Sequence, residues 1–131
     1  MANPNIVAVS NILGGNLGWN LSATTTTTLM TVAAEKLVKI NRITVANVDG
    51  SAAADVSLFV DGLTTAGATG ISPTGASATV YLAKTISVPA DATLVISDTP
   101  IYLMEGDILK GGASAASDLD LFISYEVLDD A

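Results

Sequence analysis

The chain has 131 residues, a length at which one domain can bury a substantial core without metals or disulfides. It contains no cysteine and no histidine, which excludes disulfide frameworks, thiolate nucleophiles, zinc–cysteine sites and the usual general base at neutral pH. The 5 Lys and Arg residues oppose 13 Asp and Glu residues, so a net charge of -8 argues against nucleic-acid and anionic-membrane partners.

The first 34 residues carry no charged side chain. Asn, Gly, Ser and Thr interrupt this stretch, so it holds no apolar run of ~20 residues that could form a transmembrane helix. No basic residue precedes an apolar segment, so we expect no secretory signal. Residues 5–13 read as a strand that ends at Gly14-Gly15, and residues 17–23 and 29–34 as further strands. The threonine run at 24–28 favours extended backbone because β-branched side chains fit a pleated strand.

Residues 36–48 give the clearest strand pattern. Apolar side chains alternate with polar ones along both halves, but the parity of the alternation shifts by one residue at Asn41-Arg42. A strand with period 2 cannot change faces without an inserted residue. The sequence therefore predicts a β-bulge or a sheet-switching bend at this point.

The rest of the chain reads as short strands separated by turn residues. Asp49-Gly50 is a turn signal. Residues 55–61, 79–88, 92–97, 101–105, 107–110 and 118–128 are predicted strands, residues 62–78 a long loop, and residues 111–117 a small-residue turn. In the last strand the predicted inward positions are Leu119, Leu121, Ile123, Tyr125 and Val127.

Eight to ten strands, turn signals every ~8–12 residues and no convincing helix predict an all-β fold. We expect an antiparallel β-sandwich, jelly-roll-like, as a single domain over residues 1–131. A closed barrel is the alternative architecture.

The only abundant ionisable groups are carboxylates. Glu105 and Asp107 flank a glycine, and Asp118 and Asp120 point the same way from one strand. Such pairs can serve acid–base chemistry or bind Ca²⁺, but the chain has no calcium-loop spacing and few aromatic residues to stack a sugar. Neither Gly-rich segment holds the lysine of a phosphate-binding loop. We therefore expect solvated turns, no enzymatic activity, no cofactor and no metal.

Outward-pointing aromatic residues and the N-terminus are the candidate interface. Alternation places Phe59 and Phe122 away from the core, where they are either covered by other parts of the chain or form a subunit contact. Trp19 is either a buried loop anchor or an interface hot spot. Residues 1–9 make a poor autonomous strand and form a candidate N-terminal arm that adds to a neighbour's sheet edge; its candidate contact residues are Asn3, Pro4, Ile6 and Val7. Charged residues make up only 14% of the chain, against ~25% in typical domains, so we expect a homo-oligomer, with a trimer as the leading hypothesis.

Several segments together resemble a family of small virion proteins of tailed bacteriophages, notably marine phages of cyanobacteria. The resemblance spans nearly the whole chain and rests on core and turn sequences: residues 1–7 (MANPNIV), 43–50 (ITVANVDG), 86–95 (ISVPADATLV), 101–107 (IYLMEGD) and 123–126 (ISYE). It implies a structural component of the particle, made in the bacterial cytoplasm and placed on the capsid surface as a decoration (cement) protein in contact with the major capsid protein. A tail, neck or head-fibre component is the alternative, and a carbohydrate-binding module is the alternative from another class. Residues 62–78 match no pattern of the family.

Overall fold

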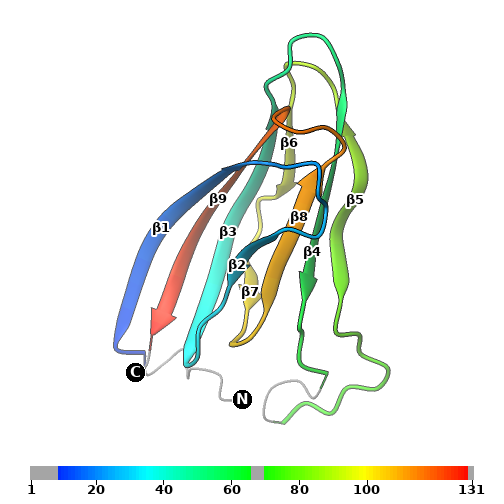
Figure 1. Cartoon of the computed structure of the whole chain (residues 1–131). Helices are drawn as coiled ribbons and strands as arrows, with labels where there is room; N and C mark the ends of the chain where they lie inside the picture. The colour runs from blue at the N-terminus through cyan, green and yellow to red at the C-terminus, as the bar shows by residue number, and fades with distance from the viewer. Residues whose placement is uncertain (1–8, 66–69, 130–131) are drawn as a thin grey trace.

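The computed structural model describes residues 9–65 and 70–129, and these residues form antiparallel β-strands without a helix (Figure 1). The strands are β1 (Asn11–Asn20), β2 (Thr28–Thr31), β3 (Lys36–Asn47), β4 (Ala54–Asp61), β5 (Val80–Val88), β6 (Thr93–Ser97), β7 (Ile101–Leu103), β8 (Ile108–Ala113) and β9 (Leu119–Asp129).

The strands build two facing sheets. One sheet has the order β1-β9-β3-β6, with β7 pairing farther along the same edge of β3, and the other has the order β2-β8-β4-β5. Successive strands mostly cross from one sheet to the other, which is the jelly-roll arrangement of two Greek keys. The predicted antiparallel, jelly-roll-like β-sandwich is confirmed. The closed-barrel alternative is wrong, because the two sheets keep separate edges.

Strand β3 is the centre of the first sheet and contains the predicted bulge. It pairs with β9 on one side, and the register shifts between Ile40 and Arg42, which leaves Asn41 as the extra residue. The Asn41 side chain donates to a Glu126 carboxylate oxygen, 3.5 Å away. The extra residue restores the inward direction of the second half of β3, so both halves bury their apolar side chains in the core.

The core lies between the sheets and is aliphatic. It combines inward residues of the long strands of both sheets, and its fully buried large side chains are Leu21, Ile40, Ile43, Leu58, Leu103, Leu109, Leu119, Leu121, Ile123, Val45, Val56 and Val88. The inward positions predicted for the last strand are confirmed: the first three are buried, and Tyr125 and Val127 pack against the core.

The N-terminal region departs from the expected strand breaks. β1 runs through Gly14-Gly15 without interruption, because each residue pairs in continuous register with β9. Only Thr28 of the threonine run lies in a strand, as the first residue of β2, and the other four threonines do not extend it. Instead Thr24 and Thr27 form a turn, in which the Thr27 hydroxyl donates to the Thr24 carbonyl at 2.7 Å. Threonine hydroxyls can bond to nearby backbone, and here this local bond outweighs β propensity.

The predicted turn at residues 111–117 is confirmed only for residues 114–117, because β8 continues to Ala113. Gly111 and Gly112 are buried within the sandwich. A Cβ atom on Gly111 would lie 2.5 Å from the Ser57 carbonyl oxygen of β4, and one on Gly112 would lie 2.5 Å from the Thr24 carbonyl oxygen. The glycines are therefore required for close approach of backbone segments, not for a turn.

Asp61 fastens the two ends of the 62–79 connection. Its carboxylate accepts hydrogen bonds from the Gly62 N–H at 2.9 Å and from the Thr79 hydroxyl at 2.7 Å. It also forms an ion pair with Lys110 of β8 at 2.9 Å. These three donors, with Lys110 the largest contributor, lower the pKa of the Asp61 carboxyl from 3.8 to about 2.

Gly111→Ala is expected to destabilise the fold by about 1–3 kcal/mol, because the new methyl group collides with the β4 backbone. Gly14→Ala is the matched control, since a Cβ there meets nothing within 4 Å and should change stability by less than about 0.5 kcal/mol. Urea unfolding of both variants measures the difference. Equal stabilities would contradict the close-approach role of Gly111.

Asp61 should make stability depend on acid pH. Its folded-state pKa of about 2 lies below the ordinary 3.8, so its ionised form stabilises the fold above about pH 4. This stabilisation is lost as the pH falls from about 4 to 2, where the folded carboxylate is protonated. Thermal melting of the wild type and of Asp61→Asn should therefore differ at pH 6 and converge near pH 2. A difference that stays constant over this range contradicts the assignment.

Candidate functional site

Two of the predicted interface aromatics, Phe59 and Phe122, differ in their exposure to solvent. Phe122 lies on the outer face of the first sheet and its side chain is 48% exposed, as the alternation predicted. Phe59 is only 7% exposed, which agrees with the first of its two predicted alternatives, cover by other parts of the chain, and removes it from the exposed interface candidates. Its ring packs on the Tyr81 ring of the neighbouring strand β5, with centroids 5.0 Å apart. The Tyr81 ring of the same chain therefore covers Phe59 on the outer face. The alternation pattern could not reveal this contact, because it says nothing about which strands are neighbours.

Trp19 lies in a strand and not in a loop. It lies in β1 opposite Leu121 of β9, half-buried and packed against the core. The loop position of the first interpretation is therefore wrong, while the role of Trp19 as an interface hot spot stays a prediction. The remaining candidates, Asn3, Pro4, Ile6 and Val7, and with them most of the proposed 1–9 arm, lie outside the described residues.

A shallow hollow lies beside Phe122. It has a volume of about 310 Å³ and is lined by Gly18, Trp19, Asn20, Asp120, Leu121 and Phe122. Asn20 and Asp120 face each other across β1 and β9, and the Asn20 amide donates to the Asp120 carboxylate at 2.8 Å. An aromatic side chain beside an amide–carboxylate pair offers an apolar contact together with hydrogen-bonding groups. Asn20 and Asp120 are 100 residues apart in the sequence, and the pairing of β1 with β9 brings them together.

A second, more apolar surface lies on the open side of the sandwich. There β1 and the short strand β2 are the edges of the two sheets, and a groove of about 300 Å³ lies between them. Its lining is mostly hydrophobic, and consists of Leu17, Met30, Thr31, Val32, Ala33, Lys36, Val38, Tyr125 and Val127.

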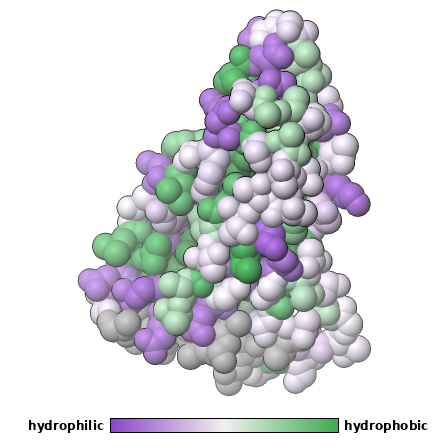
Figure 2. Space-filling model, in the orientation of Figure 1, coloured by the Kyte–Doolittle hydropathy of each residue, from purple (hydrophilic) through white to green (hydrophobic). Residues whose placement is uncertain are grey.

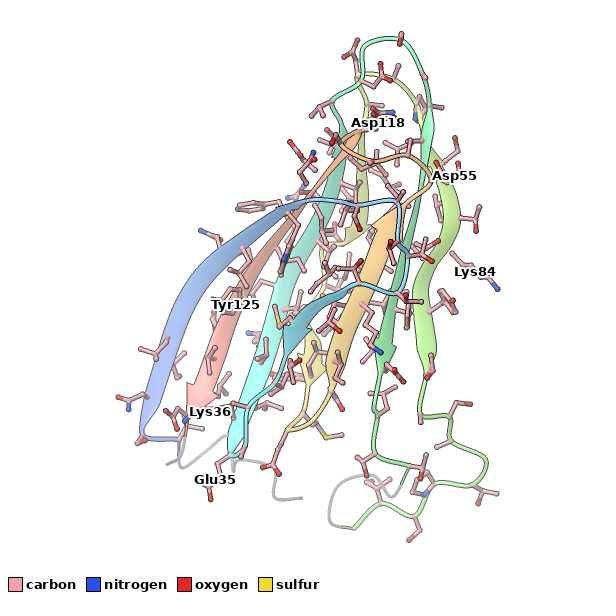
Figure 3. All side chains as sticks on the ribbon, viewed as in Figure 1. Glu35, Lys36, Asp55, Lys84, Asp118 and Tyr125 are labelled. Atoms are coloured by element: carbon pink, nitrogen blue, oxygen red, sulfur yellow. The ribbon has the colours of Figure 1, made fainter. Side chains whose placement is uncertain are left out.

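Strand β1 also exposes apolar side chains to solvent. Ile12 is 60% exposed and Leu13 58% exposed, and Figure 2 shows hydrophobic surface over the lower half of this strand. The Tyr125 ring (labelled in Figure 3) lies over Gly15, where a Cβ atom would come within 2.8 Å of it. The ring thus fills the place of the missing side chain and leaves the β1 edge itself open.

This β1 surface was missed as an interface, although its signal was in the sequence. The 34 residues without a charged side chain supply both edges of the open side, β1 and β2. Uncharged composition alone served only to test for a membrane segment. The uncharged residues form one surface only because β1 pairs with β9, β2 pairs with β8, and the two sheets then place β1 and β2 on the same side of the sandwich.

The Glu105 and Asp107 carboxylates serve local structure. A Glu105 carboxylate oxygen accepts the Glu35 N–H at 2.7 Å, and an Asp107 carboxylate oxygen accepts the Met104 N–H at 2.7 Å. Asp107 is buried, and this burial raises the pKa of its carboxyl despite the Met104 bond. Over residues 9–65 and 70–129, no group of three or more acidic side chains is arranged to hold a metal ion. In the same ranges no helix has the length and apolarity to cross a membrane.

Comparison of the chain with family models, with curated proteins and with solved structures finds no match. The interpretation of its surfaces therefore depends on their own chemistry.

The two phenylalanines provide a direct test of the outer-face assignments. Phe59→Ala should destabilise the fold by about 3 kcal/mol, because it removes a buried ring. Phe122→Asp should leave the far-ultraviolet circular dichroism unchanged and alter stability by less than about 0.5 kcal/mol, because its ring is half in solvent. Chemical denaturation of both variants measures these effects. Unfolding of Phe122→Asp would show that the ring belongs to the packed structure.

Proposed function

We propose that this protein is a structural component of a bacteriophage virion, and that it acts as a capsid decoration protein on the head surface. The observation that carries the proposal is the exposed apolar surface of the edge strand β1, which has no charged side chain. Strand β1 belongs to an uncharged stretch that makes up about a quarter of the chain, and it presents exposed apolar residues, while all charged side chains, with a net charge of -8, belong to residues 35–131. An exposed apolar strand without charged side chains is suited to lasting contact with other protein subunits.

Two further features support this proposal. The segments quoted above resemble small virion proteins of tailed phages over nearly the whole chain. The jelly-roll arrangement is also one that viral capsid domains use, although this support is analogy, because one fold serves many functions. In this proposal the protein is made in the host cytoplasm, forms a homo-oligomer and contacts the major capsid protein. A tail, neck or head-fibre position is the alternative within the particle.

One observation favours a second candidate function. The hollow beside Phe122 places an aromatic ring next to the Asn20–Asp120 pair, and jelly rolls also serve as lectin domains. A carbohydrate-binding module would use such a combination of apolar face and hydrogen-bonding groups. In that case Phe122→Ala should abolish binding to a glycan array, and Ile86→Ala, on the β5 edge, should leave it unchanged.

The decisive experiment is a quantitative protein gel of purified virions of a phage that encodes this chain, with mass-spectrometric identification of the band. A decoration protein should be present in a copy number comparable to that of the major capsid protein. A few copies per particle would instead assign it to the tail or neck. Its absence from purified virions, with abundant protein in the infected-cell lysate, would overturn the virion role.

A further inference from the structure

Strand β1 is the least protected of the sheet edges in the described residues. Edge strands are usually kept from pairing by shortness, bulges, proline or charge. β2 has 4 residues, and β6 and β7 share an edge interrupted by a segment with Pro100. β5 has two register shifts, Thr85 at a φ of 53°, and Lys84, which projects outward (Figure 3). β1 has 10 residues in unbroken register with β9, and no strand among the described residues pairs with its other edge.

The open edge presents backbone groups in a defined phase. The Leu21 N–H donates to the Leu119 carbonyl at 2.8 Å and continues the register of β1 against β9. Hydrogen-bonded pairs alternate along an antiparallel ladder, so the odd-numbered residues of β1 bond to β9. The N–H and C=O groups of the even-numbered residues therefore point to the open edge; these residues are Ile12, Gly14, Asn16, Gly18 and Asn20.

Charge indicates which partner this edge suits. Two copies of a chain with net charge -8 repel each other over most of their surfaces. The repulsion is smallest where neither copy has charged side chains, and β1 lies within the uncharged stretch that ends before Glu35. A basic partner would gain nothing from this edge and would favour the acidic parts of the surface. The edge is therefore best matched to a second copy of this chain.

We propose that β1 pairs antiparallel with β1 of a second copy around a two-fold axis at Gly15. In this register Leu13 of one copy lies opposite Leu17 of the other, and Gly14 lies opposite Asn16. Leu13 and Leu17 both belong to the inner face of the sheet, since they pair with Val127 and Ile123 of β9. Each exposed leucine is then covered by its counterpart, while the even-numbered residues supply the hydrogen bonds.

This contact is isologous and closes at two subunits, so it favours a dimer over the trimer expected from the sequence. It goes beyond the virion role and does not depend on it, because the contact can be measured on the purified chain. A failure to pair leaves the virion proposal standing, and absence from virions leaves the pairing standing.

Sedimentation velocity of the purified chain, at concentrations up to millimolar, tests the pairing. The wild type should show a species of twice the 13.2 kDa chain mass that dissociates on dilution. Asn16→Pro should be monomeric with unchanged circular dichroism, because proline removes an N–H that faces the open edge and is tolerated at such a position. Asn16→Ala, which keeps the N–H, should dimerise like the wild type. A wild type that stays monomeric, or an oligomer that Asn16→Pro leaves intact, overturns the proposal.

Two further variants keep the test valid if Asn16→Pro does not fold. Leu13→Lys places a charge on the proposed contact, and Ile86→Lys places the same charge on the exposed β5 edge. Only the first should weaken the dimer, and equal effects would refute the pairing.

Cross-linking tests the register. The chain has no cysteine, so a Leu13→Cys/Leu17→Cys double variant introduces the only thiols. Residues 13 and 17 would form a non-hydrogen-bonded pair with Cα atoms about 4.5 Å apart, within the range for a disulfide. Mild oxidation should give a covalent dimer from the double variant and not from either single variant. Efficient dimers from a single variant would contradict this register.

Discussion

The sandwich depends on one extra residue in its central strand. β3 pairs with β9 along its whole length and with β6 and β7 on the other side, so its faces set the faces of the entire first sheet. Without Asn41, one half of β3 would turn its apolar side chains to solvent. With it, Val38 and Ile40 and then Ile43 and Val45 all reach the core.

The second sheet depends on two residues of β8 that have no side chain, Gly111 and Gly112. At Gly111 the backbone of β4 comes so close that a methyl group has no room, and at Gly112 the threonine turn between β1 and β2 does the same. The Gly111 N–H donates to the Thr27 carbonyl and the Ala113 N–H to the Ser22 carbonyl. This contact fixes how the chain crosses from β1 to β2, and so places both uncharged edges on one side of the molecule.

That placement gives the protein an uneven surface. Charged and polar contacts hold the ends of the 62–79 connection, and the Asp61–Lys110 ion pair is the clearest of them. The β1 edge instead presents leucine and isoleucine side chains and backbone groups that pair with no strand among the described residues. An edge with these properties is a hazard in an isolated domain, since it invites pairing with other strands. It is a useful feature in a subunit of an assembly, where the same backbone groups supply adhesion without requiring a particular side chain.

The sequence is sufficient to predict the strand content, the inward face of the last strand and the bulge at Asn41, because period-2 alternation is a local property of extended chain. It could not determine the roles of its glycines and threonines. Gly14-Gly15 and Gly111-Gly112 are typical turn sequences, and only the neighbouring strands show that they lie within β1 and β8. The conformation of the threonine run likewise depends on the β8 glycines that pack beside it. Phe59 and Phe122 have the same outward parity, yet only Phe59 has an aromatic neighbour on the adjacent strand to cover it. Exposure is a property of non-local packing, so the exposed residues can be identified only once the neighbours of each strand are known.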